Sequence, residues 1–517
     1  MRPHLIRQER SVLLRAMLTT ATLCVALPAG AQQQHLGPVD NLLLKNPYAS
    51  PASGFFGRGL AAGDFDDDGI SDLVVMEDGG ERMRIFRGTD FTVGTDPLFN
   101  FFGTTVTTPS HSHVVASGDF DGDGRDEIAV SAFTTAVGGQ LAAGRVHVMD
   151  RAPNGTWSVQ STIQAGGAYP GAPQAVANFG YSLAVGDFND DGFADLAIGM
   201  RGQTVLGFAN AGAIMITYGS ANGITAGNAR IINRTSDGLA LAPREGDRFG
   251  WALAAGDFDA DGDDDLAIGV LNATCPNGTD RAGAVIVLNG SPQNGISNAQ
   301  SRIWRPGVQG IAGDCSVADD FGFALAAGRF GRRGWNAEPY DDLAIGAPET
   351  SGSAGAVHVL YGTASGLDAE GNQHLLPPAL PGIISGAGRF GRSLATGVLA
   401  RYCVVVTCQG DSLAVGAPFA TVNGTASAGV VWTFHHDSSN RLDAASARPI
   451  LPLPPLKISG PHANDQFGST LAIGDFNGDS HSDLAIGVFL YDDGGNTDAG
   501  AVQVVYQSDF LFLDGFD

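Results

Sequence analysis

Five segments of the chain share one spacing of acidic residues. Each has Asp at its first position, Asp or Asn at the third, Asp at the fifth, a turn residue at the sixth and an acid at the ninth. Calcium takes roughly six to eight oxygen ligands, and a tight loop with this spacing turns alternate carboxylates inward. Position seven adds its main-chain carbonyl group. The predicted ligands are, loop by loop, Asp64, Asp66, Asp68, Ile70 and Asp72; Asp119, Asp121, Asp123, Arg125 and Glu127; Asp187, Asn189, Asp191, Phe193 and Asp195; Asp257, Asp259, Asp261, Asp263 and Asp265; and Asp475, Asn477, Asp479, His481 and Asp483.

Acidic turns that are simply solvated are the alternative to calcium sites. One such loop would leave that interpretation open, whereas five loops in the same register favour metal. Without metal, repulsion between the carboxylates would strain each loop. We therefore predict about five calcium ions, which would offset part of the net charge of −25. Ser480 replaces the glycine that the other loops have at position six, which predicts a weaker site there.

The loops lie inside a longer repeat. A Phe-Gly pair opens six of seven units, a short apolar run precedes the loop, and a second run of the type DLAIG follows it. A glycine-led run, such as 283–290, and a weaker one, such as 301–306, complete a unit. Short runs rich in Val, Ile and Ala between turn residues predict four strands per unit. The central phrase occupies residues 59–75, 114–130, 182–199, 252–269, 324–348, 393–418 and 470–487.

These repeats predict an all-β fold, a seven-bladed β-propeller with four-stranded antiparallel blades. A lone sheet of this kind exposes two apolar faces, and a radial arrangement buries each face against its neighbour. A linear solenoid is the competing arrangement, but units of this length are long for it. Residues 36–50 precede the first Phe-Gly pair and are predicted to supply the outer strand of the seventh blade, which would remove the open edge of the ring.

Units five and six lack the acidic loop. Arg329 and Val398 stand where the other units have their first aspartate, and the following insertions carry no matching set of carboxylates. We expect no calcium in these two units.

The first 31 residues have the pattern of an export signal, with arginines, then an apolar stretch, then Ala29-Gly30-Ala31 before Gln32. A buried N-terminal helix is the alternative. The predicted division is therefore a signal peptide (1–31), the propeller (32–506) and a tail of unknown role (507–517). We expect a secreted, periplasmic or cell-surface protein without a membrane span.

Four cysteines follow the predicted signal, and strand direction suggests how they pair. Cys275 and Cys315 fall in connections on the face opposite the acidic loops, whereas Cys403 and Cys408 share the loop of unit six. We predict the disulfides Cys275–Cys315 and Cys403–Cys408, because mixed pairs would have to cross the height of the ring.

The Phe-Gly pairs, the acidic loops and the Gly-Ala-Pro triplets at 346–348 and 416–418 resemble the FG-GAP repeat. The resemblance covers about residues 50–506. It implies the seven-bladed propeller of integrin α subunits and of many bacterial exported proteins, with calcium between the first two strands of a blade. It also implies that ligands bind on the opposite face.

The sequence favours a binding module over an enzyme. No zinc-protease, nucleophile-elbow or phosphate-loop motif occurs, so no catalytic residue is predicted. The expected partner is an extracellular protein or glycan, bound by a monomeric propeller. The acidic surface disfavours nucleic acid. An exported hydrolase or lyase acting on polysaccharide or phosphoester is the alternative, since propellers also host active sites.

Overall fold

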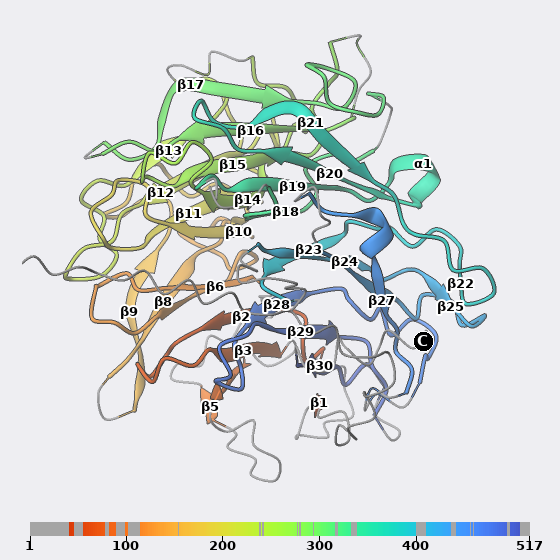
Figure 1. Cartoon of the computed structure of the whole chain (residues 1–517). Helices are drawn as coiled ribbons and strands as arrows, with labels where there is room; N and C mark the ends of the chain where they lie inside the picture. Colours follow the sequence, from red (N-terminus) through yellow and green to blue (C-terminus); the bar gives the residue numbers. More distant parts are fainter. Residues whose placement is uncertain are drawn as a thin grey trace, which may run out of the picture. The chain divides into compact units, whose positions relative to one another are not determined.

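The computed structural model describes residues 41–45, 55–77, 82–88, 99–101, 114–152, 155–236, 239, 242–276, 278, 281–292, 294–315, 319–331, 339–399, 410–435, 441–454, 456, 458, 460–493 and 497–506. Within them, seven four-stranded antiparallel sheets follow one another along the chain. The fold is the predicted seven-bladed β-propeller (Figure 1). The segments 1–31 and 507–517, with Cys403 and Cys408, lie outside the described residues.

The first four blades follow chain order. Blade one contains β2 (Leu60–Gly63), β3 (Asp72–Glu77), β4 (Arg82–Phe86) and β5 (Phe99–Phe101). Blade two contains β6 (Val115–Gly118), β7 (Glu127–Ser131), β8 (Val146–Arg151) and β9 (Trp157–Ile163). Blade three contains β10 (Phe179–Gly186), β11 (Asp195–Met200), β12 (Ala213–Thr217) and β13 (Arg230–Ile232). Blade four contains β14 (Phe249–Gly256), β15 (Asp265–Val270), β16 (Ala284–Asn289) and β17 (Ser297–Trp304).

The later blades carry small additions. Blade five contains β18 (Leu325–Gly328), β19 (Asp342–Ala347), the turn α1 (Thr350–Ser353), β20 (Ala356–Tyr361) and β21 (Asp368–Leu375). Blade six contains β23 (Ser393–Gly397), β24 (Ser412–Ala417), β26 (Val430–Phe434), η2 (Ala444–Ser446) and β27 (Arg448–Ile450), and β22 (Ile384–Ser385) pairs beside it with β25 (Thr421–Val422). Blade seven contains β28 (Leu471–Gly474), β29 (Asp483–Val488) and β30 (Ala501–Val505).

The ring closes with a strand from the beginning of the described chain. β1 (Leu42–Lys45) pairs antiparallel with β30, with Leu42 opposite Val504 and Lys45 opposite Ala501. The amide of Gln503 also donates a hydrogen bond to the side-chain oxygen of Asn41 at 2.9 Å. The predicted outer strand of the seventh blade is therefore confirmed, at four residues inside the range 36–50.

The first strand of each sheet lies nearest the axis of the ring. β2 contacts β6 and β28, and each further first strand contacts the next, through β10, β14, β18 and β23 (Figure 1). Every second strand is largely buried on both faces, because each blade packs against two neighbours. This packing explains why runs such as DLAIG are continuously apolar rather than alternating.

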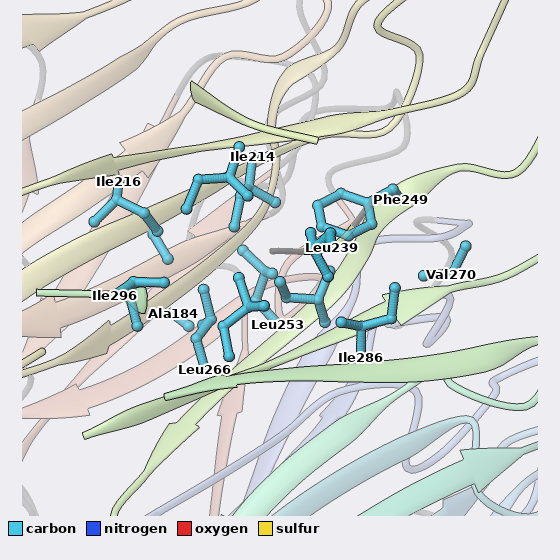
Figure 2. Close-up of a cluster of buried hydrophobic side chains, with 14 of the residues drawn as sticks. Ala184, Ile214, Ile216, Leu239, Phe249, Leu253, Leu266, Val270, Ile286 and Ile296 are labelled. Carbon is cyan, nitrogen blue, oxygen red and sulfur yellow. The ribbon is translucent and has the colours of Figure 1, made fainter. Parts of the chain in front are cut away.

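A hydrophobic cluster fills the space between blades three and four. Ile214 and Ile216 of β12 face Leu266 and Ile286 of β15 and β16 (Figure 2). Phe249, at the start of β14, is fully buried in this cluster. Similar clusters lie between the other pairs of neighbouring blades. At roughly 25 cal/mol for each Å² of apolar surface removed from water, these contacts are the main stabilising term of the ring.

The Phe-Gly pair joins each blade to the one before it. Phe249 forms a parallel bridge with Gly212, the residue that leads into β12 of blade three. Gly250 then adopts φ +81°, and a Cβ atom there would lie 2.7 Å from the carbonyl oxygen of Ala213. Only glycine fits this close approach, which accounts for the pair at the start of each such unit.

Candidate metal centres

The acidic loops connect the first and second strands of blades one, two, three, four and seven. In blade one, Asp64 directly follows β2, and Asp72 is the first residue of β3. All five loops therefore lie at the same end of the sheets, where the axial strands finish. This common position is what the repeat spacing predicts.

One pattern of hydrogen bonds shapes all five loops. The carboxylate at position one accepts from the main-chain N–H of position six, at 2.8 Å for Asp64 and Gly69 and at 2.7 Å for Asp475 and Ser480. The carboxylate at position five accepts from position seven, at 2.9 Å for Asp68 and Ile70. The loops of blades two, three and four have the same two hydrogen bonds, from position six to position one and from position seven to position five.

Two residues of each loop have positive φ. At position four these are Asp67, Gly122, Asp190, Ala260 and Gly478, and at position six they are Gly69, Gly124, Gly192, Gly262 and Ser480. Ser480 has φ 66°, so the last loop keeps the backbone of the others despite its missing glycine. A side chain in this region costs roughly 1–2 kcal/mol, which still favours a weaker site there.

In the part of the chain that the structure describes, the carboxylates of three of these loops converge. Oxygen atoms of each group lie within 4.8 Å of one another. The remaining two loops have Asn at position three, so Asn189 and Asn477 would contribute amide oxygens instead. The three groups are Asp64, Asp66 and Asp68; Asp119, Asp121, Asp123 and Glu127; and Asp257, Asp259 and Asp261.

Two buried oxygens make these loops suitable for a hard cation. Oδ1 of Asp66 and Oε1 of Glu127 are buried and have no hydrogen-bond partner. Burial is the main cause that raises the pKa of Asp66, and the neighbouring Asp68 raises it further. A cation bound in each of these two loops would satisfy its unpaired oxygen and reduce the repulsion, so the donor sets fit calcium.

The acid at position nine has a second role as a brace. Asp195 is fully buried, and its two oxygens accept from the main-chain N–H groups of Phe188 and Gly219, each at 2.9 Å. Burial raises the pKa of Asp195 to about 8 and that of Glu127 to about 8. In blade five, Asp342 accepts from Gly362 at 2.8 Å in the same way, although no acidic loop precedes it. The brace therefore exists with or without a predicted metal site.

The loops are also joined from blade to blade, through position eight, which the sequence analysis did not single out. The N–H of Asp64 donates to Oδ2 of Asp126 in the next blade at 3.0 Å, and the N–H of Asp126 donates to the carbonyl oxygen of Asp64 at 2.8 Å. Asp187 and Asp264 repeat this reciprocal pair. The sequence does carry a signal for this link, because several units have an acid directly before the DLAIG-type run: Asp126, Asp264, Asp341 and Asp411.

Blade five replaces the first aspartate by a cation. Nε of Arg329 donates to Oδ1 of Asp341 at 2.9 Å, and its main-chain N–H donates to Oδ2 of Asp411 at 2.8 Å. Its positive charge occupies the loop position that carries a carboxylate in the five acidic loops. This arrangement supports the expectation that blade five binds no calcium.

The opposite end of the sheets carries the disulfide between Cys275 and Cys315. Their Cα atoms are 6.2 Å apart, and 40 residues separate them in sequence. Cys275 follows β15 of blade four, and Cys315 precedes the Phe-Gly pair of blade five. No helix in the described ranges is long and apolar enough to cross a membrane.

Comparisons with known proteins agree with the repeat. A family model described as FG-GAP repeat matches residues 113–149, 179–215, 249–288 and 467–505, and one described as FG-GAP-like repeat matches 48–130. Integrin alpha-8 of Mus musculus is 30% identical over 179 residues, which cover 34% of this chain and 15% of the relative. Integrin alpha-PS5 of Drosophila melanogaster is 33% identical over 194 residues, which cover 37% and 16%.

A second group of relatives consists of enzymes. Phosphatidylinositol-glycan-specific phospholipase D of Rattus norvegicus is 30% identical over 182 residues, which cover 35% of this chain and 20% of the relative. The matched part thus spans about a fifth or less of these three relatives. The chain thus contains FG-GAP repeats, folds as a seven-bladed β-propeller, and is similar over about a third of its length to integrin α subunits.

Proposed function

We propose that the chain is an exported calcium-binding propeller that acts as a binding or adhesion module for an extracellular protein or glycan. The observation that carries the proposal is the shared geometry of the five acidic loops at one end of the ring. Calcium there would stabilise the blades, leaving the face at the other end available for a ligand. The integrin α relatives support this division of roles.

A stable, braced scaffold suits recognition because it presents loops in fixed positions. The connection between β19 and β20 (residues 348–355) lies at the end away from the acidic loops, and so does the disulfide-linked connection at Cys315. Such connections vary from blade to blade, while the acidic loops keep one geometry. This contrast favours the variable end as the ligand face.

A test combines a glycan array with a pull-down from extracellular extracts, each using the full chain with calcium and with a chelator. We expect a saturable ligand in at least one format, with weaker binding after chelation. A matched variant, Asp119→Ala, should lose part of the metal and keep the ligand face. Absence of any saturable ligand in the calcium-loaded protein would contradict the proposal.

One pocket favours the alternative, an exported hydrolase, as a second candidate. Its lining includes Asp319, Glu349, His358 and His374, at the end of blade five away from the loops. The rings of His358 and His374 stack at 4.5 Å, and burial lowers the pKa of His358 to about 3. A pKa of about 3 makes His358 a weak base at neutral pH, so the proton acceptor of this candidate is His374, whose pKa is lowered by burial and raised in part by Asp319. Activity on phosphodiester substrates that disappears in His374→Gln would support this candidate, and equal activity in that variant would reject it.

A further inference from the structure

Aromatic side chains gather at the beginning of the axial strands, at the end opposite the acidic loops. Tyr181, Trp251 and Phe323 each directly follow a Phe-Gly pair, in three consecutive blades. The ring of Tyr181 lies 4.9 Å from that of Trp251, and Trp251 lies 5.6 Å from Phe323. Phe133 extends the row, 5.4 Å from Tyr181. We call these four residues and the arginines Arg201, Arg248 and Arg392 the axial cluster.

The three arginines pack on these rings. Arg201 lies 3.8 Å from the ring centre of Tyr181 and 5.0 Å from that of Trp251. Arg248 lies 5.3 Å from Trp251, and Arg392 lies 4.8 Å from Phe323. The charges of all three, with that of Arg58, act on the hydroxyl group of Tyr181. Cations from blades one, three, four and six therefore converge on one place.

Arg201, Arg248 and Arg392 are not neutralised by ion pairs within the described part of the chain. Among the described residues, no carboxylate lies within ion-pair distance of Arg201, Arg248 or Arg392. Nε of Arg201 is buried without a hydrogen-bond partner. Asp320 and Glu349 act on Arg392 through space, and Asp320 also acts on Arg248, while Glu349 pairs with Arg389 at 2.8 Å. A partly buried cation without an ion-pair partner is costly, and stacking on aromatic rings offsets only part of that cost.

We propose that the axial cluster binds a carboxylate group of a polypeptide ligand. The proposal rests on the binding role inferred above and names the chemistry of the ligand. A guanidinium group that stacks on an aromatic ring keeps its N–H donors free at its edge, and their fork matches a carboxylate. The hydroxyl group of Tyr181 supplies a further donor.

Two observations favour a peptide carboxylate, one over polyanions and the other over sugars. The net charge of −25 repels polyanions at long range, which favours a ligand with an isolated carboxylate. Arg201 covers the face of Tyr181 at 3.8 Å, so this ring is not open for stacking on a sugar. A peptide carboxylate needs only the donors at the guanidinium edges.

The test measures fluorescence anisotropy of labelled peptides with the full, calcium-loaded chain. The probes are a blocked pentapeptide with one central Asp between glycines, its Asn counterpart, and an oligogalacturonate as the glycan arm. We expect the Asp peptide to bind at least tenfold more tightly than the Asn peptide. Arg201→Gln and Arg392→Gln should each weaken binding of the Asp peptide at least tenfold. Arg281→Gln, at an exposed site, should leave the affinity for this peptide unchanged.

Melting temperature and calcium content identify variants that fail to fold. Equal affinity for the two peptides, or unchanged affinity in folded Arg201→Gln and Arg392→Gln, would overturn the proposal, as would tighter binding of oligogalacturonate. If the wild type captures a ligand in the pull-down and the double arginine variant captures it equally, the binding role stands and this site is wrong. If the wild type captures nothing and binds neither peptide, both proposals fail.

Discussion

Asp64 and Asp126 hold neighbouring blades together through two reciprocal hydrogen bonds, of 3.0 and 2.8 Å. One residue opens the acidic loop of blade one and the other ends the loop of blade two. Equivalent main-chain bonds join Ala194 to Asp119 and Ser71 to Asp475. The acidic loops are therefore linked to the adjacent blades and do not act as isolated turns.

Replacing Asp126 by Ala should destabilise the propeller by about 1–3 kcal/mol, because the N–H of Asp64 loses its acceptor in a partly buried position. Asp126→Asn keeps an acceptor oxygen and should cost less. Urea denaturation of both variants at saturating calcium measures the difference. If both variants unfold at the wild-type urea concentration, the link contributes nothing to stability.

Metal analysis of the purified protein should find about five calcium ions, since five loops share one geometry. Asp119→Ala should reduce the content by one ion, because it removes the carboxylate that organises its loop. Chelation should lower the melting temperature. A calcium concentration of about a hundred times the Kd of a site adds about 2.7 kcal/mol to the free energy of unfolding for that site. A chelated protein that melts at the same temperature would show that the loops hold no stabilising metal.

The stability of the calcium-loaded protein should fall as the pH rises from about 4 towards 7, through Asp342. Burial raises the pKa of Asp342 to about 7 in the folded protein, from an ordinary value of 3.8. The folded state thus binds a proton that the unfolded state has released, so this contribution is complete at low pH and is lost through pH 7. It amounts to at most about 4 kcal/mol.

Asp342→Asn should reduce that pH dependence, and Asp368→Asn, at an exposed site, should not. Urea midpoints at pH 5 and pH 7.5, all with saturating calcium, provide the comparison. An identical slope in wild type and Asp342→Asn would mean that another group is responsible.

Deletion of residues 36–50 should destabilise the whole ring, because β30 loses its pairing with β1 and exposes a strand edge. We expect a lower melting temperature and self-association in size-exclusion chromatography. Lys45→Ala is the control: it removes the exposed 2.8 Å pair with Asp493, worth no more than about 1 kcal/mol, and the contact with the Tyr491 ring, but keeps the strand pairing. A monomeric deletion variant of wild-type stability would exclude a role for the seam.

The double variant Cys275→Ser and Cys315→Ser should lose about 2–4 kcal/mol, because the bond closes a segment of 40 residues. Non-reducing peptide mapping should recover Cys275 with Cys315 and, as predicted from the sequence, Cys403 with Cys408. A peptide that joins Cys315 to Cys403 would contradict the arrangement of the blades.

The sequence was sufficient for the blades because their signals are local. The DLAIG runs, Phe-Gly pairs and acidic spacings each fit within one unit, and the predicted strands at 283–290 and 301–306 correspond to β16 and β17. The closing strand could also be predicted, since a ring of repeats needs one more strand than its last unit contains. The strand and loop signals act over a few residues, and the need for a closing strand follows from the ring as a whole.

Other features depend on which units become neighbours. Asp126 and Asp64 are 62 residues apart, so their link cannot be seen in either repeat alone. The axial cluster places Arg392 of blade six over the ring of Phe323 of blade five, a contact that neither repeat shows alone. The dual role of Asp195 was also hidden, because a buried brace and a metal ligand require the same carboxylate at position nine.

The pairing of β1 with β30 also has a consequence for biosynthesis. Asn41 and Gln503, which meet at this seam, are 462 residues apart. Almost the entire chain must leave the ribosome before its ends can meet, and until then the last assembled blade keeps an unpaired edge. Any product that terminates before β30 cannot close, so it should remain a substrate for proteases and chaperones. The seam thus makes resistance to degradation depend on complete translation of the propeller.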